Sequence, residues 1–333
     1  MVVEKNYAVS LLRFIAMIFI VLCHFLQFYD LELAWWFNVG VQIFLCISGF
    51  LYGNKKIDSP IDFIGRNFKK ILIPYYCFFI PMVVFYSIFL PESLNVTNVI
   101  NSFLTGSTIK GLEHLWFISY ILFCYLITPY LYTLTEKMKK LKWYMFLSVF
   151  SAMVVLGFVL SYVFKSYFDF SRIVCYLFGY FGAVFLKNYD EKIFKILTFV
   201  LTAIMLFMNS VRVYAKYIKE MDFSLLDLFI SYAHALLGIC IVFLFVILVK
   251  NIKNNLLLSL SDKYSFYIYI VHQFYILSPF NLLTITACKP LNWCVTIISI
   301  LLSAIILKFI CGKVNKLFDK TINVLKQWSF DPA

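Results

Sequence analysis

The first long apolar run of the sequence carries two ionisable residues at a spacing that suits shared chemistry. Arg13 and His24 are 11 residues apart, about three turns of an α-helix, so both side chains fall on one face, with their Cα atoms about 16 Å apart along the axis. A guanidinium can hold a phosphate through two parallel hydrogen bonds, and a neutral, partly desolvated imidazole can accept a proton. We interpret the pair as an anion clamp and a general base, although Arg13 taken alone would be an interfacial charge whose head reaches water.

Ionisable residues are costly inside a membrane, and this sequence places several of them in apolar segments. All four histidines fall within or at the ends of such segments: His24, His114, His234 and His272. Two of the expected helices carry stripes of polar residues at helical spacing: Ser265, Tyr269 and His272, and Asp227, Ser231 and His234. One such histidine alone would be interpreted as a packing residue bonded to a neighbouring helix. All four together favour a polar site within the fold, while the roles of Asp227 and His234 stay open.

Two further polar clusters stand at the ends of apolar segments: Glu113, His114 and Trp116 at the start of the fourth, and Arg66, Lys69 and Lys70 at the cytoplasmic end of the third. The first cluster adds a carboxylate and an imidazole to the candidate polar site. The second offers positive charge for an anion, but the usual excess of basic residues on the cytoplasmic side explains it equally well.

The composition indicates the elements that must hold these residues. Of 333 residues, 63% are hydrophobic and 14% are charged, and the mean hydropathy is +0.88. Soluble domains carry about 25% charged residues, so a chain this apolar is typical of a membrane protein. We predict an all-α, polytopic membrane helix bundle of about ten transmembrane helices. The expected helices cover residues 8–28, 35–53, 71–90, 114–133, 143–163, 172–187, 193–209, 224–249, 264–280 and 291–311.

The basic residues predict the orientation of these helices. With a cytoplasmic N-terminus, the inner segments hold 20 Lys and Arg residues and the outer segments hold 7, which favours cytoplasmic N- and C-termini. The net charge of +12 follows from this bias and indicates attraction to anionic lipid, not binding of nucleic acid. The run 8–28 has the length of a membrane helix, so we expect it to be retained and not cleaved as a signal peptide.

Four segments, in this order along the chain, resemble motifs of the acyltransferase-3 family of bacterial integral-membrane O-acyltransferases. Arg13 and His24 match the arginine and histidine of the family's first helix, which are separated by ten residues. The other matches are Val41–Phe50 with FF-x-x-SG-F, His114–Phe117 with HLWFL, and Ser265–His272 with SYxIYLxH. One departure concerns the family's R-x-x-R pair, which here becomes Arg66 and Lys69. Lysine keeps the charge of arginine but loses its fork of donors.

The resemblance implies an enzyme that moves an acyl group, usually acetyl, from cytoplasmic acetyl-CoA to a hydroxyl of a cell-envelope glycan or a lipid-linked saccharide. It implies His24 as the catalytic residue, with supporting polar residues: Glu113, His114, Trp116, Tyr269, His272 and Ser48. The phosphates of CoA are expected on basic residues: Arg13, Arg66, Lys69 and Lys70. The distance along the helix from Arg13 to His24 is roughly that of an extended pantetheine arm. A single multi-pass domain, residues 1–333, in the cytoplasmic (inner) membrane is expected, with no metal and no fused extracytoplasmic hydrolase-like domain.

Other interpretations stay open at this point. Intramembrane His and Asp residues also form proton relays, so a proton-coupled secondary transporter is the main alternative. The sequence shows no inverted repeat to support it. A structural or sensor protein would explain the hydrophobicity but not the ordered polar motifs. Direct transfer and an acyl-histidine relay are both compatible with His24, and neither the acceptor nor the acyl chain length follows from the sequence.

Overall fold

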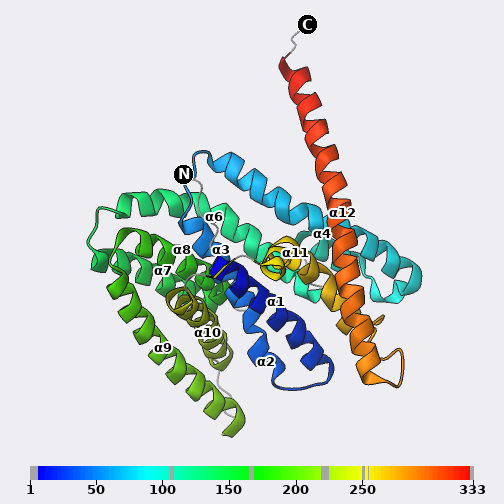
Figure 1. Cartoon of the computed structure of the whole chain (residues 1–333), viewed down its shortest axis with the longest axis horizontal. Coiled ribbons are helices and arrows are strands. Elements are labelled where there is room, and N and C mark those ends of the chain that lie inside the picture. The colour runs from blue at the N-terminus through cyan, green and yellow to red at the C-terminus, as the bar shows by residue number, and fades with distance from the viewer. Residues whose placement is uncertain are drawn as a thin grey trace. The chain divides into compact units, whose positions relative to one another are not determined.

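The computed structural model describes residues 7–105, 109–164, 169–218, 225–249, 252–253 and 255–330. It is 85% helical, and the described residues form no strand. The α-helices (Figure 1) are α1 (Tyr7–Phe28), α2 (Ala34–Phe37), α3 (Val39–Gly53), α4 (Pro60–Phe89), α5 (Val96–Thr105), α6 (Phe117–Met138), α7 (Trp143–Val163), α8 (Phe170–Asn188), α9 (Glu191–Val213), α10 (Leu226–Leu248), α11 (Leu256–Leu277) and α12 (Lys289–Phe330). Three short elements accompany them: the 3₁₀ turns η1 (Pro91–Ser93) and η2 (Glu113–Trp116), and the π-helical η3 (Tyr214–Ile218).

The prediction of a polytopic helical membrane protein is confirmed. Within the described residues, nine helical segments are long and apolar enough to cross a membrane: α1, α2 with α3, α4, η2 with α6, α7, α8, α9 with η3, α10, and α12 as far as Thr321. The remaining predicted segment, 264–280, is helical in α11 but is not among these nine. That helix carries Asp262, Lys263, His272 and Gln273, which lower its apolar character. The cytoplasmic placement of the termini and the single-domain organisation stay predictions.

Several helices extend beyond their predicted ends because their terminal turns are polar. Helix α4 begins at Pro60 instead of residue 71, so Arg66, Lys69 and Lys70 lie within the helix. Helix α9 continues past residue 209 to Val213 and passes directly into η3. An apolar pattern alone marks the part of a helix that lies in lipid and misses the turns that project from it.

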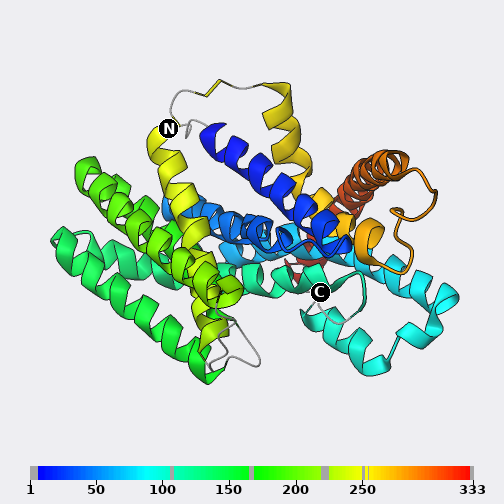
Figure 2. The ribbon, with the colours of Figure 1, turned by 90° about the horizontal axis from the view of Figure 1, so that it is seen from below.

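Two compact units make up the chain: Met1–Phe63 with Phe123–Asp262, and Ile64–Leu122 with Lys263–Ala333. In the first unit α3 packs against α1, α8 and α10, while α7 and α9 pack outside α8 and α10. Figures 1 and 2 show α7, α8, α9 and α10 as neighbouring helices of this unit. Its most buried spans are α8 and the α2–α3 segment. In the most apolar stretch of each, 72% and 61% of the residues are buried. These two spans form the core on which the site-bearing α1 rests.

Two glycines allow α3 and α8 to cross at very short range. A Cβ atom built on Gly49 would lie 2.0 Å from the carbonyl oxygen of Tyr176, and one built on Gly179 would lie 1.9 Å from that of Cys46. No side chain fits at either position without separating the two backbones. Small residues commonly let membrane helices approach in this way. The glycine of the Ser48-Gly49-Phe50 motif therefore has a packing role.

The second unit is held by aromatic contacts and by bonds to backbone carbonyls. The ring of Phe280, after α11, packs edge-on against Phe85 of α4 with 4.8 Å between the ring centroids. The hydroxyl of Tyr86 donates to the carbonyl of Lys110 over 2.8 Å, and that of Tyr75 donates to the carbonyl of Ser102. These bonds connect α4 to Ser102 of α5 and to Lys110, which lies shortly before Glu113 and His114 of η2.

Candidate functional site

Helix α1 carries Arg13, and the structure gives this arginine an acidic partner. Its Nη1 donates to Oδ1 of Asp262, in the second turn of α11, over 2.7 Å. The hydroxyl of Ser10, one turn before Arg13, donates to the other carboxylate oxygen over 2.7 Å. Both charged side chains are mostly buried, with 25% and 14% of their side-chain surface exposed. The pair uses one of the five donors of the guanidinium, so further donors remain for an anion.

His24 lies on the same unbroken helix and on the same face as Arg13. Its Nδ1 lies 3.0 Å from Oε1 of Gln27, one turn further along α1. A carbonyl oxygen can only accept, so Nδ1 carries the proton and Nε2 carries the lone pair of the neutral ring. This side chain is half-buried. The arrangement provides an oriented imidazole whose Nε2 can accept a proton from a bound group.

A second polar cluster forms in the other unit, around the predicted residues His114 and His272. Their ring centroids lie 4.8 Å apart, and both side chains are buried. Nε2 of His114 donates to the carbonyl of Ile270 over 2.9 Å, and Nδ1 of His272 donates to the carbonyl of Tyr269 over 2.6 Å. Each neutral ring therefore directs its N–H at the backbone and keeps its lone pair on the opposite nitrogen.

Three more residues complete this histidine cluster, which we define as Glu113, His114, Tyr269, His272 and Gln273. The hydroxyl of Tyr269 donates to the carbonyl of His114. The side chain of Gln273 accepts from the amide of His114 over 2.7 Å and donates to Oε2 of Glu113 over 3.1 Å. The structure thus brings together four of the predicted supporting residues and adds Gln273, which directly follows His272 but belongs to none of the polar stripes in the sequence.

The other predicted site residues have separate environments. Trp116, in η2, packs edge-on against Tyr120 with 5.3 Å between the ring centroids. Ser48 lies half-buried on α3 in the first unit. On α4, Lys69 pairs with Asp319 of α12, while Arg66 and Lys70 are exposed. Arg13 belongs to the first unit and these three basic residues to the second, so their shared role toward one ligand stays a prediction.

His234 takes part in a buried cluster that the sequence did not indicate. Arg212, at the end of α9, is only 2% exposed, and its Nη1 donates to Nδ1 of His234 over 3.2 Å. The guanidinium also stacks over the ring of Trp36, 4.7 Å from the ring centroid. Cation–π contact of this kind stabilises a desolvated arginine, so the cluster has a clear packing role in the first unit.

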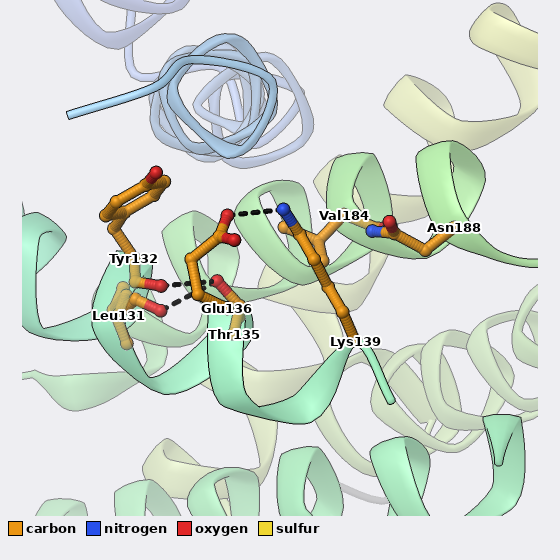
Figure 3. A network of polar contacts seen from close by, with 7 residues as sticks. All are labelled: Leu131, Tyr132, Thr135, Glu136, Lys139, Val184 and Asn188. Atoms are coloured by element: carbon orange, nitrogen blue, oxygen red, sulfur yellow. Dashed lines mark hydrogen bonds and ion pairs between the residues drawn. The ribbon is translucent and has the colours of Figure 1, made fainter. Parts of the chain in front are cut away.

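A basic pocket lies elsewhere in the first unit, where α3, α6 and α8 end. We call it the lysine pocket; its cavity measures about 240 Å³, and its charged and polar lining includes Lys55, Lys56, Glu136, Lys139, Lys187 and Asn188. Figure 3 shows the ion pair of Glu136 with Lys139 across the α6 side of this pocket. Beneath it, the hydroxyl of Thr135 donates to the carbonyl of Leu131 over 2.9 Å. The pocket brings together lysines from three segments that the charge count predicts to be cytoplasmic.

The electrostatics of this pocket favour an anion. Lys56 donates to Asp58 over 2.8 Å, and this hydrogen bond raises the pKa of Lys56 above its ordinary value, so the ammonium stays protonated at neutral pH. Lys55 stacks over the ring of Tyr52, 5.0 Å from the ring centroid. The four lysines outnumber Glu136 and Asp58, so the pocket keeps a net positive charge.

The sequence comparisons agree with the motifs. The model of the Acyl_transf_3 family, described as an acyltransferase domain, matches residues 6–312, nearly the whole chain. Comparisons with curated proteins and with solved structures gave no match. Among the residues that the structure describes, no group of three or more His, Cys, Asp or Glu side chains could hold a metal ion, and metal independence stays a prediction. The chain therefore belongs to the acyltransferase-3 family, as a multi-pass membrane acyltransferase.

Proposed function

We propose that this acyltransferase moves an acetyl group from cytoplasmic acetyl-CoA to a hydroxyl of a cell-envelope glycan or a related lipid-linked saccharide. The observation that carries the proposal is the geometry of α1 within a chain of this family. Nδ1 of His24 donates to Gln27, which leaves Nε2 as the basic atom, and Arg13 lies three turns away on the same face. An anion clamp and a base at this separation suit a donor whose phosphates and thioester lie far apart.

The reaction that follows is a direct acyl transfer. Nε2 of His24 takes the proton of the acceptor hydroxyl as its oxygen attacks the thioester carbonyl. A carbon–oxygen bond forms, the carbon–sulfur bond breaks, and the imidazolium returns its proton to the leaving thiolate. The products are an acetyl ester and CoA with a free thiol, and His24 ends the cycle neutral. Glu113, His114, Trp116, Tyr269, His272 and Ser48 are assigned a supporting polar role, and Arg13, Arg66, Lys69 and Lys70 a role in holding the donor.

A transfer assay tests this function directly. The purified protein, in lipid nanodiscs, is incubated with radiolabelled acetyl-CoA and washed membranes. The membranes come from a strain that lacks the gene for this protein, and they supply the acceptor. We expect alkali-labile label on the envelope glycans and release of CoA thiol in equal amount. We also expect acetyl-CoA at about 100 times its Kd to stabilise the protein by about 2.7 kcal/mol. A transporter of unrelated solutes would show neither effect, and that result would refute the proposal.

Replacing Gln27 tests how the base is oriented. We expect Gln27→Ala to lower kcat about fivefold without changing KM for acetyl-CoA, because it removes a hydrogen bond worth about 1 kcal/mol that fixes the ring of His24. Gln27→Glu keeps an acceptor for Nδ1 and should retain most of the wild-type rate. Gln27 is exposed, so melting temperatures should stay unchanged in both variants. Equal rates in Gln27→Ala and the wild type would show that this contact does not orient the base.

A further inference from the structure

We propose that the lysine pocket binds phosphate groups of the acyl-CoA donor. This inference rests on the proposed function and assigns the donor a site on residues that the family motifs do not contain. The pocket is built where three helices of the first unit end: Gly53 closes α3, Glu136 lies in the last turn of α6, and Lys187 lies in the last turn of α8.

The charge of the lining is the first argument. Lys139 is paired with Glu136 and Lys56 with Asp58, but Lys187 forms no ion pair with any residue that the structure describes. Excess lysines at helix C-termini offset the negative end of the helix dipole and also follow the cytoplasmic bias. Those effects account for their number, but neither requires lysines from three separate segments to line one cavity. Ammonium groups that line a cavity from several sides are well placed for the oxygens of a phosphate.

The size of the cavity is the second argument. A volume of about 240 Å³ has room for about eight water molecules. That space is enough for a phosphate or diphosphate group and too small for a whole CoA molecule. The remainder of the donor must therefore leave the pocket, with its pantetheine arm directed toward the thioester site.

Continuity with Arg13 is the third argument. Lys55 of the pocket stacks on the ring of Tyr52, and that ring packs edge-on against the ring of Tyr125 with 5.2 Å between the centroids. Tyr52 lies on α3, which packs directly against α1, the helix that carries Arg13. Arg13 is already paired with Asp262, so it is a weakened site for a polyanion by itself. The pocket therefore supplies, at the end of a helix that packs against α1, positive charge in addition to that which Arg13 shares with Asp262.

Binding of CoA to a pocket variant tests the inference without an acceptor. We compare Lys55→Gln/Lys187→Gln with Lys137→Gln/Lys140→Gln, a control that removes two charges from exposed lysines outside the pocket. Titration calorimetry measures the Kd of CoA, of its 3′-dephospho form and of pantetheine, in nanodiscs of phosphatidylcholine. We expect the Kd of CoA to rise about tenfold in the pocket variant and to change less than twofold in the control. The Kd of pantetheine, which has no phosphate, should be the same in all three proteins.

The contrary outcomes are distinct. If both double variants weaken the binding of CoA equally, only general surface charge matters. If the pocket variant weakens the binding of pantetheine as much as that of CoA, phosphate recognition is excluded. A pocket variant with the wild-type Kd for CoA, but without the stabilisation that phosphatidylglycerol nanodiscs give the wild type, would assign the pocket to a lipid headgroup and overturn the inference. Wild-type protein that binds CoA through the pocket yet transfers no acetyl group would refute the proposed function alone. Normal transfer with an unchanged Kd in the pocket variant would refute the inference alone.

Discussion

His24→Ala is expected to lower the rate of acetyl transfer by about 10²–10⁴-fold, the usual range for loss of a general base. The acceptor hydroxyl must lose its proton as it attacks the thioester, and in this variant only water would take it. The binding of CoA should stay unchanged, because His24 is not assigned to the phosphates and Arg13, the donor-binding residue on the same helix, lies about 16 Å from it along α1. The measurement is the transfer assay, with yield and melting temperature compared to the wild type.

Two controls separate a chemical role of His24 from a structural one. Added imidazole should restore part of the rate in His24→Ala, since a small base can enter the space left by the side chain, whereas a misfolded protein would not respond. His272→Ala removes a ring from the histidine cluster of the other unit. Near-normal turnover in His24→Ala combined with loss of turnover in His272→Ala would transfer the role of base to that cluster.

Gly49→Ala is expected to have the largest effect on folding. Its new methyl group would lie 2.0 Å from the carbonyl oxygen of Tyr176 and 2.8 Å from the amide nitrogen of Tyr180. Both atoms belong to the backbone of α8, so no rotamer change can relieve the overlap and the two helices must separate. Overpacking of this kind costs about 3 kcal/mol or more, and the Tm should fall by about 5 °C or more.

A matched glycine provides the control for this experiment. At Gly65, on α4, no atom other than those of the neighbouring residues and the backbone of its own helix lies within 4 Å of the position that a Cβ would take. Gly65→Ala should therefore fold as well as the wild type, or slightly better, since alanine favours a helix over glycine by about 1 kcal/mol. The readouts are the yield of monodisperse protein and its melting temperature. A Gly49→Ala variant that melts with the wild type would show that α3 and α8 do not need this close crossing.

The parts of the fold that could be predicted are those that depend on local pattern. The register of Arg13 and His24 follows from helical spacing, and the structure has α1 continuous through both. Gln27 lies three residues from His24, so the partner of the base could also have been found by its spacing. Apolar runs located most of the helices but not their polar ends, which is why the expected helix begins at residue 71 whereas α4 already includes Arg66 in its second turn.

The parts that could not be predicted depend on contacts between distant segments. Asp262 reaches Arg13 across 249 positions of sequence, and no local pattern connects them. Lys55, Lys139 and Lys187 were recognised only as cytoplasmic charges, because their meeting around one cavity depends on the packing of α3, α6 and α8. Arg212 looked like a residue of an outer loop, and only the extension of α9 buries it against Trp36.

The ion pair of Arg13 with Asp262 also affects which anions can bind to the guanidinium. A carboxylate tethered within the fold competes at the high effective concentration of an intramolecular partner, so a free chloride or inorganic phosphate ion meets a guanidinium whose charge is already partly neutralised. A donor whose phosphates are bound elsewhere on the protein is also held close to Arg13. It therefore competes with Asp262 for the guanidinium at a similarly high effective concentration. Under the proposed function, we expect Asp262, whose other carboxylate oxygen accepts from Ser10, to be the sole anionic partner of Arg13 again once the spent donor has left. On this proposal, we expect the carboxylate to keep anion binding at Arg13 selective between one turnover and the next.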